Sequence, residues 1–173
     1  MRWRIRRADE RDADALALIG SATFLDAYAG RMPGAGIVAH AAAKNQPATY
    51  ARWGTAADHA LWLVEADEGG APVGYQVVAP PDMDGFTAAP GDVELKRIYL
   101  LSRLYGTGAG QALMDEAIRW AREQGMARLL LALWDENFRA LAFYRRQGFA
   151  QIGQRRFQVG AQVYDDPVLA LDL

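Results

Sequence analysis

The chain has 173 residues, of which 51% are hydrophobic and 23% are charged, and its formal net charge is −2. This length and composition predict one folded domain over residues 1–173 and exclude a disordered chain, and the net charge gives no sign of a nucleic-acid or anionic-membrane partner. Because the chain lacks cysteine, a secretory signal and any apolar run of about 18 residues, we expect a cytoplasmic protein without disulfides or membrane spans.

The first half of the chain alternates between strand-like and helix-like patterns. The strand patterns are short and bounded by turn residues, whereas the helical patterns have apolar residues three or four positions apart. Asp9 stands where it can cap the first helix. The expected elements are a strand over 3–8, a helix over 13–28, a break over 31–36, an Ala-rich helix over 37–53, strands over 60–67 and 72–80 joined by a hairpin turn, and a loop over 79–91.

The second half continues this alternation and then closes with a hairpin. Glycines stand where helices should end, at Gly125 and Gly148. The strand, turn, helix and strand between 92 and 134 are typical of a right-handed crossover unit. The expected elements are a strand over 92–101, a helix over 107–124, a buried strand over 127–134, a helix over 136–147, and two hairpin strands over 149–160 and 162–173.

Three glycines, Gly106, Gly108 and Gly110, alternate in the segment "LYGTGAGQ" directly before a predicted helix. Glycine lets a backbone approach an anion closely, and a helix N-terminus attracts negative charge, so this turn predicts a phosphate site. A mononucleotide loop would need Gly-Lys-Ser/Thr where the chain has "GQA", and a dinucleotide fold would need Gly-x-Gly-x-x-Gly in the first crossover. The remaining alternative is a structural turn without a ligand, although three glycines would cost up to roughly 1 kcal/mol each in a regular element.

Residues that commonly carry catalysis are scarce in this chain. The two histidines, His40 and His59, lie in different segments, so we expect no metal site. Neither serine lies in a Gly-x-Ser-x-Gly elbow, which excludes a typical serine hydrolase. The chemistry is therefore expected to use carboxylates, tyrosines and backbone amides, or a bound co-substrate.

Residues 94–117, "ELKRIYLLSRLYGTGAGQALMDEA", resemble the acetyl-CoA-binding motif of the GNAT superfamily of N-acetyltransferases, Gln/Arg-x-x-Gly-x-Gly/Ala. Residues 134–149, "WDENFRALAFYRRQGF", are similar to that family's second signature, and the order of elements matches over nearly the whole chain. The segment "ELKRIYLL" and the C-terminal hairpin look most like the branch that includes bacterial spermidine/spermine acetyltransferases. One position departs from the motif: Tyr105 stands where the family has Gln or Arg, in the frame that ends at Gly110. A second frame, starting at Arg103, restores the Arg but ends two residues early relative to the helix.

The resemblance implies both the fold and the acetyl donor. The implied fold is α/β (α+β): a mixed, mostly antiparallel sheet of about seven strands with a splayed parallel pair, flanked by about four helices. Acetyl-CoA is the implied co-substrate, without a metal. Its pantetheine arm is expected along the strand near Ile98, Tyr99 and Leu100. Its pyrophosphate is expected on the backbone N–H groups of Tyr105, Gly106, Thr107, Gly108, Ala109 and Gly110.

The resemblance also implies roles for three side chains. An attacking amine must lose a proton and the departing thiolate must gain one, so a base and an acid suit this chemistry. Glu94 corresponds by spacing to the base of the histone-acetyltransferase branch, acting through a water; the alternative is an ion pair with Lys96 or Arg97. Tyr144 corresponds to the family's general acid beside the CoA sulfur; the alternative is a core tyrosine. Asn137 corresponds to a residue that contacts the CoA arm, and it can also cap the last helix.

The implied reaction is direct transfer of an acetyl group to a polyamine or another small primary amine. A peptide or protein N-terminus and a non-catalytic acyl-CoA sensor are the alternatives; a pure binder would need neither Glu94 nor Tyr144. A homodimer is compatible with the resemblance. The first two helices and the 79–91 loop are expected to frame the acceptor pocket. The candidate residues there are Asp26, Tyr28, Asp82 and Asp84; the alternative for the three carboxylates is that they are simply solvated.

Overall fold

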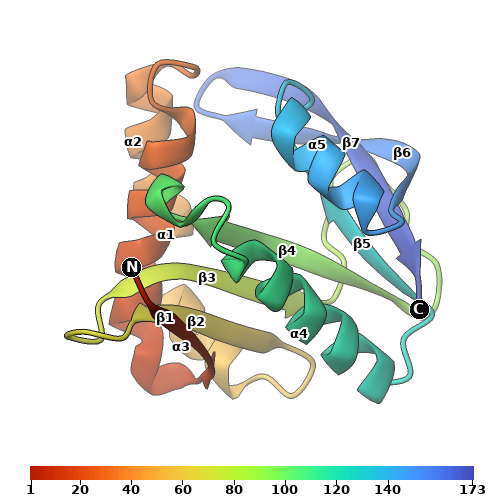
Figure 1. Ribbon diagram of the computed structural model, residues 1–173. Helices are drawn as coiled ribbons and strands as arrows, with labels where there is room; N and C mark the ends of the chain where they lie inside the picture. Colours follow the sequence, from red (N-terminus) through yellow and green to blue (C-terminus); the bar gives the residue numbers. More distant parts are fainter.

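Seven strands form one sheet in the order β1-β2-β3-β4-β5-β7-β6 in the computed structural model, which describes all 173 residues (Figure 1). Only β4 and β5 are parallel neighbours; every other pair is antiparallel. The mixed, mostly antiparallel sheet expected from the sequence is therefore confirmed. The strands are β1 (Trp3–Ala8), β2 (Ala60–Ala66), β3 (Pro72–Ala79), β4 (Asp92–Leu100), β5 (Arg128–Ala132), β6 (Ala150–Val159) and β7 (Gln162–Asp172).

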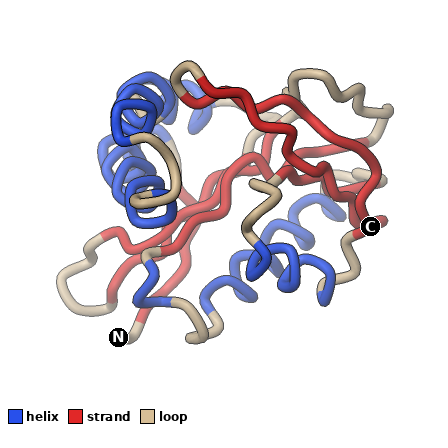
Figure 2. Tube along the Cα trace, turned by 90° about the horizontal axis from the view of Figure 1, so that it is seen from above, coloured by secondary structure: helices blue, strands red, loops and turns tan.

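Helices cover both faces of the sheet, as the view from above shows (Figure 2). None of them is both long enough and apolar enough to cross a membrane. Two short 3₁₀ turns, Glu10–Asp12 and Ser102–Leu104, precede α1 and the glycine loop. The α-helices are α1 (Ala13–Tyr28), α2 (Gly34–Lys44), α3 (Pro47–Thr55), α4 (Ala109–Glu123) and α5 (Phe138–Arg146).

The segment over 37–53 forms two helices instead of one, so the fold has five α-helices where about four were expected. Proline lacks a backbone N–H and suits the first position of a helix, so Pro47 ends one helical path and begins α3. The 31–36 break is also shorter than expected, because α2 already begins at Gly34. Asp9 caps the 3₁₀ turn before α1, by accepting the Arg11 N–H at 2.9 Å, and not α1 itself.

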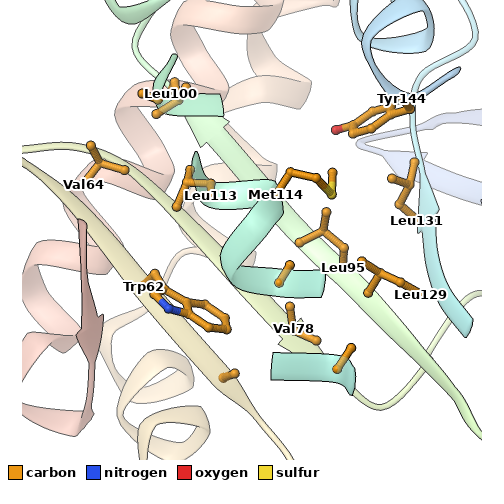
Figure 3. Packing of buried hydrophobic residues seen from close by; sticks show 14 of the residues in the cluster. Trp62, Val64, Val78, Leu95, Leu100, Leu113, Met114, Leu129, Leu131 and Tyr144 are labelled. Atoms are coloured by element: carbon orange, nitrogen blue, oxygen red, sulfur yellow. The ribbon is translucent and has the colours of Figure 1, made fainter. Parts of the chain in front are cut away.

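The largest core lies between α4 and the sheet. Leu113 and Met114 of α4 are fully buried against Trp62, Val78 and Leu95 of the strands (Figure 3). Each such aliphatic side chain contributes about 1.5–3 kcal/mol through burial. This packing fixes α4, and with it the glycine loop before it, against the middle of the sheet.

The two parallel strands β4 and β5 separate soon after they meet, which is visible as a widening gap in Figure 1. A bulge on the β3 side of β4 leaves Lys96 as an extra residue, because Leu95 and Arg97 pair with consecutive residues of β3. Bulges bend a strand and increase its twist, which turns β4 away from β5. The strands pair only at Asp92–Arg128, Val93–Leu129 and Glu94–Leu130.

An ion pair joins β4 and β5 at the closed end of this gap. The Arg128 guanidinium donates two hydrogen bonds to the Asp92 carboxylate, at 2.7 and 2.8 Å, and the Ala89 N–H donates a third at 2.7 Å. The Asp92 side chain is only 1% exposed. The hydrogen bonds from Arg128, and to a lesser degree the one from the Ala89 N–H, hold the pKa of Asp92 below its ordinary value. The pair therefore stabilises the point at which the strands separate.

Replacing Asp92 with Asn should lower the free energy of unfolding at neutral pH by about 1–3 kcal/mol, because Arg128 loses its anionic partner. A carboxylate with a lowered pKa stabilises the fold above its ordinary pKa of 3.8, and this contribution is lost as the pH falls through the native pKa. The difference between Asp92→Asn and wild type should accordingly shrink in acid. Urea unfolding from neutral to acidic pH measures it, with the exposed Asp67→Asn as control. Equal stability of the Asp92 and Asp67 variants at neutral pH would contradict this role.

Candidate active site

A cavity of about 490 Å³ lies where β4 and β5 have separated. Its walls come from the C-terminal end of α1, β4, β5, the glycine loop, α5 and the β6–β7 hairpin, and 17 of its 29 lining residues are hydrophobic. A cavity of this size with a largely apolar lining and a few polar groups suits a small-molecule ligand. It extends from the N-terminal end of α4 to the β6–β7 hairpin.

The structure brings most of the predicted cofactor residues to this cavity. The lining includes these nine: Ile98, Tyr99, Leu100, Tyr105, Gly106, Gly108, Gly110, Asn137 and Tyr144. Thr107 and Ala109 are not part of the lining. The Thr107 hydroxyl turns back to donate to the Leu104 carbonyl at 2.7 Å, and Ala109 is buried in the core under α4.

The glycine loop has the backbone geometry of an anion site. Gly106 and Gly108 adopt φ values of 78° and 89°, a left-handed conformation that favours glycine. The first hydrogen bond of α4 runs from the Ala112 N–H to the Gly108 carbonyl at 3.0 Å. The N–H groups of residues 109–111 therefore have no partner within the helix, and they lie at its positive end. This arrangement can bind a phosphate through backbone groups alone.

Cationic side chains stand beside this loop. Arg139 and Arg146 of α5 both line the cavity, and the Arg139 guanidinium lies 3.4 Å from the centroid of the Tyr105 ring. The sequence analysis missed both arginines, although their spacing of seven residues places them on one face of a helix. They add positive charge at the end of the cavity where the free N–H groups lie.

Tyr144 projects from α5 toward the gap between β4 and β5 (Figure 3). It is buried and lies among the core residues, yet it also lines the cavity. Burial, together with the nearby Tyr99 hydroxyl, raises the pKa of Tyr144 above its ordinary value. The hydroxyl is protonated at neutral pH, and its place in the cavity wall is what lets it act on a bound group; the raised pKa makes it a weaker acid than an exposed tyrosine.

Asn137 caps α5, as the sequence predicted. Its Oδ1 accepts a hydrogen bond from the Ala140 N–H at 3.2 Å. Since Asn137 also lines the cavity, capping leaves its Nδ2 free to contact a ligand there.

Glu94 is buried outside the cavity lining, on the last residue pair before β4 and β5 separate. Its Oε2 accepts hydrogen bonds from the Lys96 ammonium at 2.9 Å and from the Asp82 N–H at 3.0 Å. Its Oε1 lies 3.9 Å from an Nη of Arg155. The carboxylate is thus held by an ion pair with Lys96, while Lys96 itself reaches the cavity.

The end of the cavity far from the glycine loop contains a second polar group. Asp166 of β7 lies opposite Arg155 of β6 in the hairpin, and both line the cavity together with the aromatic side chains of Tyr28, Trp134 and Phe157. The sequence analysis named Tyr28 but missed Asp166 and Arg155. The available signal was a pair of aspartates, Asp165 and Asp166, directly before the apolar run of the last strand.

The three carboxylates that the sequence suggested for an acceptor pocket do not line the cavity. Asp26 accepts the Ser102 N–H at 2.7 Å, and Asp84 forms an exposed ion pair with Arg156 at 3.2 Å. Asp82 contributes only its backbone N–H, to Glu94. No group of three or more His, Asp or Glu side chains is arranged to hold a metal ion.

Comparison with known proteins agrees with this geometry. A sequence model of the acetyltransferase (GNAT) family matches residues 22–149. An uncharacterized N-acetyltransferase of Mycobacterium tuberculosis is 33% identical over 162 residues, which cover 94% of this chain and 98% of that protein.

Two solved structures share the fold. The PaiA N-acetyltransferase of Thermoplasma acidophilum, in complex with coenzyme A, superposes with a TM-score of 0.80 at 18% identity, over 100% of both chains. A GNAT-family acetyltransferase of Streptococcus pneumoniae superposes with a TM-score of 0.71 at 20% identity, over 99% of this chain and 100% of that one. The chain therefore belongs to the acetyltransferase (GNAT) family and is an acetyl-CoA-dependent N-acetyltransferase.

Proposed function

We propose that this protein transfers the acetyl group of acetyl-CoA directly to a small primary amine while both substrates are bound. The observation that carries the proposal is one continuous cavity that has free helix N–H groups at one end, the Tyr144 hydroxyl in its wall and a buried carboxylate, Asp166, at the other. A ternary complex needs such a space, because the amine must reach the thioester while the cofactor stays in place.

The cofactor would enter from the α4 end. Of the predicted N–H groups over 105–110, those of Tyr105 and Thr107 already donate to the Ser102 and Leu104 carbonyls, at 3.0 and 3.2 Å. The cofactor's pyrophosphate would therefore lie on the N–H groups of Gly106 and of residues 108–110, with Arg139 and Arg146 as additional cationic contacts. Its pantetheine arm would pair with the free edge of β4 at residues 98–100, where β5 has moved away, much as an added strand pairs with a sheet edge. Ala109 would contribute through its backbone N–H alone, whereas both the N–H and the hydroxyl of Thr107 donate to the Leu104 carbonyl.

The chemistry would follow from this placement. The neutral amine nitrogen attacks the thioester carbonyl carbon and gives up one proton to water, the C–S bond breaks, and the CoA sulfur leaves as a thiolate or thiol. A strand N–H near Ile98–Leu100 would stabilise the carbonyl oxygen as its negative charge develops. Tyr144, protonated at neutral pH, would donate its proton to the departing sulfur.

Glu94 remains a predicted base, acting on the amine through a water. Its buried contacts with Lys96 and the Asp82 N–H support the alternative that it mainly orders this part of β4. The two roles differ in their pH dependence and can be separated by experiment.

The resemblance to the spermidine/spermine branch makes polyamines one candidate acceptor class, beside other small primary amines. A peptide or protein N-terminus is the alternative acceptor, and an acyl-CoA sensor without turnover is the alternative function. The position of the Tyr144 hydroxyl in the cavity wall supports the enzyme, because a sensor needs no acid there. A homodimer remains a prediction.

Gly108→Glu should abolish coenzyme A binding, because the new carboxylate would occupy the place proposed for the pyrophosphate. Isothermal titration of CoA into the folded variant measures this. Gly125→Glu is the matched control, because Gly125 also has a left-handed φ, 69° against 89° for Gly108. No atom lies within 4 Å of the position of an added Cβ at either glycine, and Gly125 lies beyond the other end of α4. Unchanged CoA affinity in folded Gly108→Glu would overturn the phosphate assignment.

Tyr144→Phe should lower kcat about 10- to 1000-fold, the range expected for a lost proton-transfer group. The affinity for acetyl-CoA should hardly change, because only a hydroxyl is removed. Thiol release under saturating substrates gives kcat, and Tyr164→Phe, on the outer hairpin, is the control. Wild-type turnover in Tyr144→Phe would return this residue to a purely structural role.

Glu94→Gln separates a base from an ion-pair residue. If Glu94 accepts the amine's proton, kcat/KM should fall near neutral pH and partly recover at about pH 9–10, where solvent supplies neutral amine. If it is an ion-pair residue, the pH profile should keep its shape and the fold should lose about 1–3 kcal/mol of stability. Measuring kcat/KM from about pH 6 to 10, with chemical unfolding alongside, decides between the two; the exposed Glu123→Gln is the control.

A further inference from the structure

Two buried polar atoms at the acceptor end of the cavity have no hydrogen-bond partner: Oδ1 of Asp166 and Nε of Arg155. Their side chains are 3% and 17% exposed, they stand opposite each other in the β6–β7 hairpin, and both line the cavity. One is a hydrogen-bond acceptor and the other a donor. Unpartnered buried polar atoms are rare in folded proteins and costly, so each calls for an explanation.

The ion pair between these residues does not satisfy them. One Nη of Arg155 lies 3.5 Å from Oδ2 of Asp166, and the other lies 3.9 Å from Oε1 of Glu94. The guanidinium also packs 4.8 Å from the centroid of the Phe157 ring. Arg155 is thus held between two carboxylates by long contacts, and Oδ1 of Asp166 and Nε of Arg155 have no partner within the protein. Both atoms are buried, so a ligand that bonds to them must displace the groups that cover them.

The surroundings of Asp166 match an ammonium group. Asp166 is the only carboxylate in the cavity lining, which otherwise has Lys or Arg at all of its charged positions. Tyr28 and Trp134, whose ring centroids are 5.9 Å apart, line the same end, and aromatic faces attract cations. Burial raises the pKa of Asp166, and the facing Arg155 charge opposes that rise. An ammonium at Oδ1 would add a second favourable charge.

A single carboxylate beside a guanidinium does not suit a polycation. Spermidine or spermine would bring further ammonium groups and no oxygen for Arg155 Nε. A molecule that complements both atoms carries an ammonium group next to a carboxylate.

We propose that the acceptor is a small amino-acid-like zwitterion whose ammonium group binds Oδ1 of Asp166 and whose carboxylate binds Nε of Arg155. This inference rests on the proposed acetyl transfer and names the acceptor class for it. The bound ammonium must lose a proton before it attacks, and Oδ1 of Asp166, its proposed contact, would accept that proton. The neutral α-amine would then attack the thioester, and the aromatic side chains would surround the side chain of the amino acid.

Three matched acceptors test the ligand class: leucine, leucinamide and 3-methylbutylamine, which share a side chain but differ in the carboxylate. Spermidine is the fourth acceptor. Alanine, methionine and phenylalanine are assayed in the same way, each beside its amide and its decarboxylated amine, so that the side chain also varies. We expect kcat/KM for the best amino acid to exceed that for its decarboxylated amine and for spermidine by about 30-fold or more, as for a buried charged contact. A preference for spermidine or for the simple amines would overturn the inference.

Three variants test the residues. Asp166→Asn should raise the KM of the amino acid by about 30-fold or more while the KM of acetyl-CoA stays within twofold. Arg155→Lys, which keeps the charge but removes Nε, should abolish the preference for the amino acid over its decarboxylated amine. The exposed neighbour Asp165→Asn should behave as wild type. An unchanged amino-acid KM in folded Asp166→Asn, or a preserved preference in Arg155→Lys, would contradict the assignment.

Binding without turnover keeps this inference separate from the proposed function. Calorimetric titration of the same amino acids into the enzyme–CoA complex should show binding that Asp166→Asn weakens by about 30-fold or more, even if no transfer occurs. Absence of thiol release with every amine would refute the transferase. Absence of Asp166-dependent binding would refute the zwitterion site alone.

Discussion

The separation of β4 from β5 after Glu94 is the constraint on which the rest of the site depends. It leaves one edge of residues 95–100 without a strand partner in the middle of a sheet, where unpaired backbone groups are costly. The bulge at Lys96 turns the strand, and the Asp92–Arg128 pair fixes where the gap begins. A ligand with amide groups along an extended arm can complete the pairing, and such a ligand is coenzyme A.

The two ends of the cavity differ in charge. At one end, helix N–H groups and the arginines of α5 favour phosphates; at the other, Asp166 among aromatic rings favours an ammonium group. Tyr144 lies in the wall of the same cavity, where an acid can serve the departing sulfur. Arg155 bridges Asp166 and Glu94, so a change at Glu94 can reach the acceptor end through Arg155 as well as through proton transfer.

The sequence predicted elements better than side-chain environments. Periodicity placed every strand within two residues of its observed ends, and the glycine motif led to the α4 end of the cavity. Periodicity could not show that the Ala-rich segment is divided into two helices at Asn45 and Pro47, because alanine favours helix on both sides. The sequence could not distinguish Asp166 from its neighbour Asp165, because only the folded hairpin shows which of the two lines the cavity. The sequence offered an ion pair between Glu94 and Lys96 as an alternative, but it could not show that the Glu94 carboxylate is buried.

Amide hydrogen exchange with and without coenzyme A tests the central claim most directly, because it reports on backbone groups along both parts of the site. The account predicts that CoA slows exchange at residues 98–100 of the free β4 edge and at residues 108–111 at the start of α4, while the distant β1–β2 pairing is unaffected. Tight binding of CoA with no added protection at either segment would contradict this account, because the gap between β4 and β5 would then not hold the cofactor.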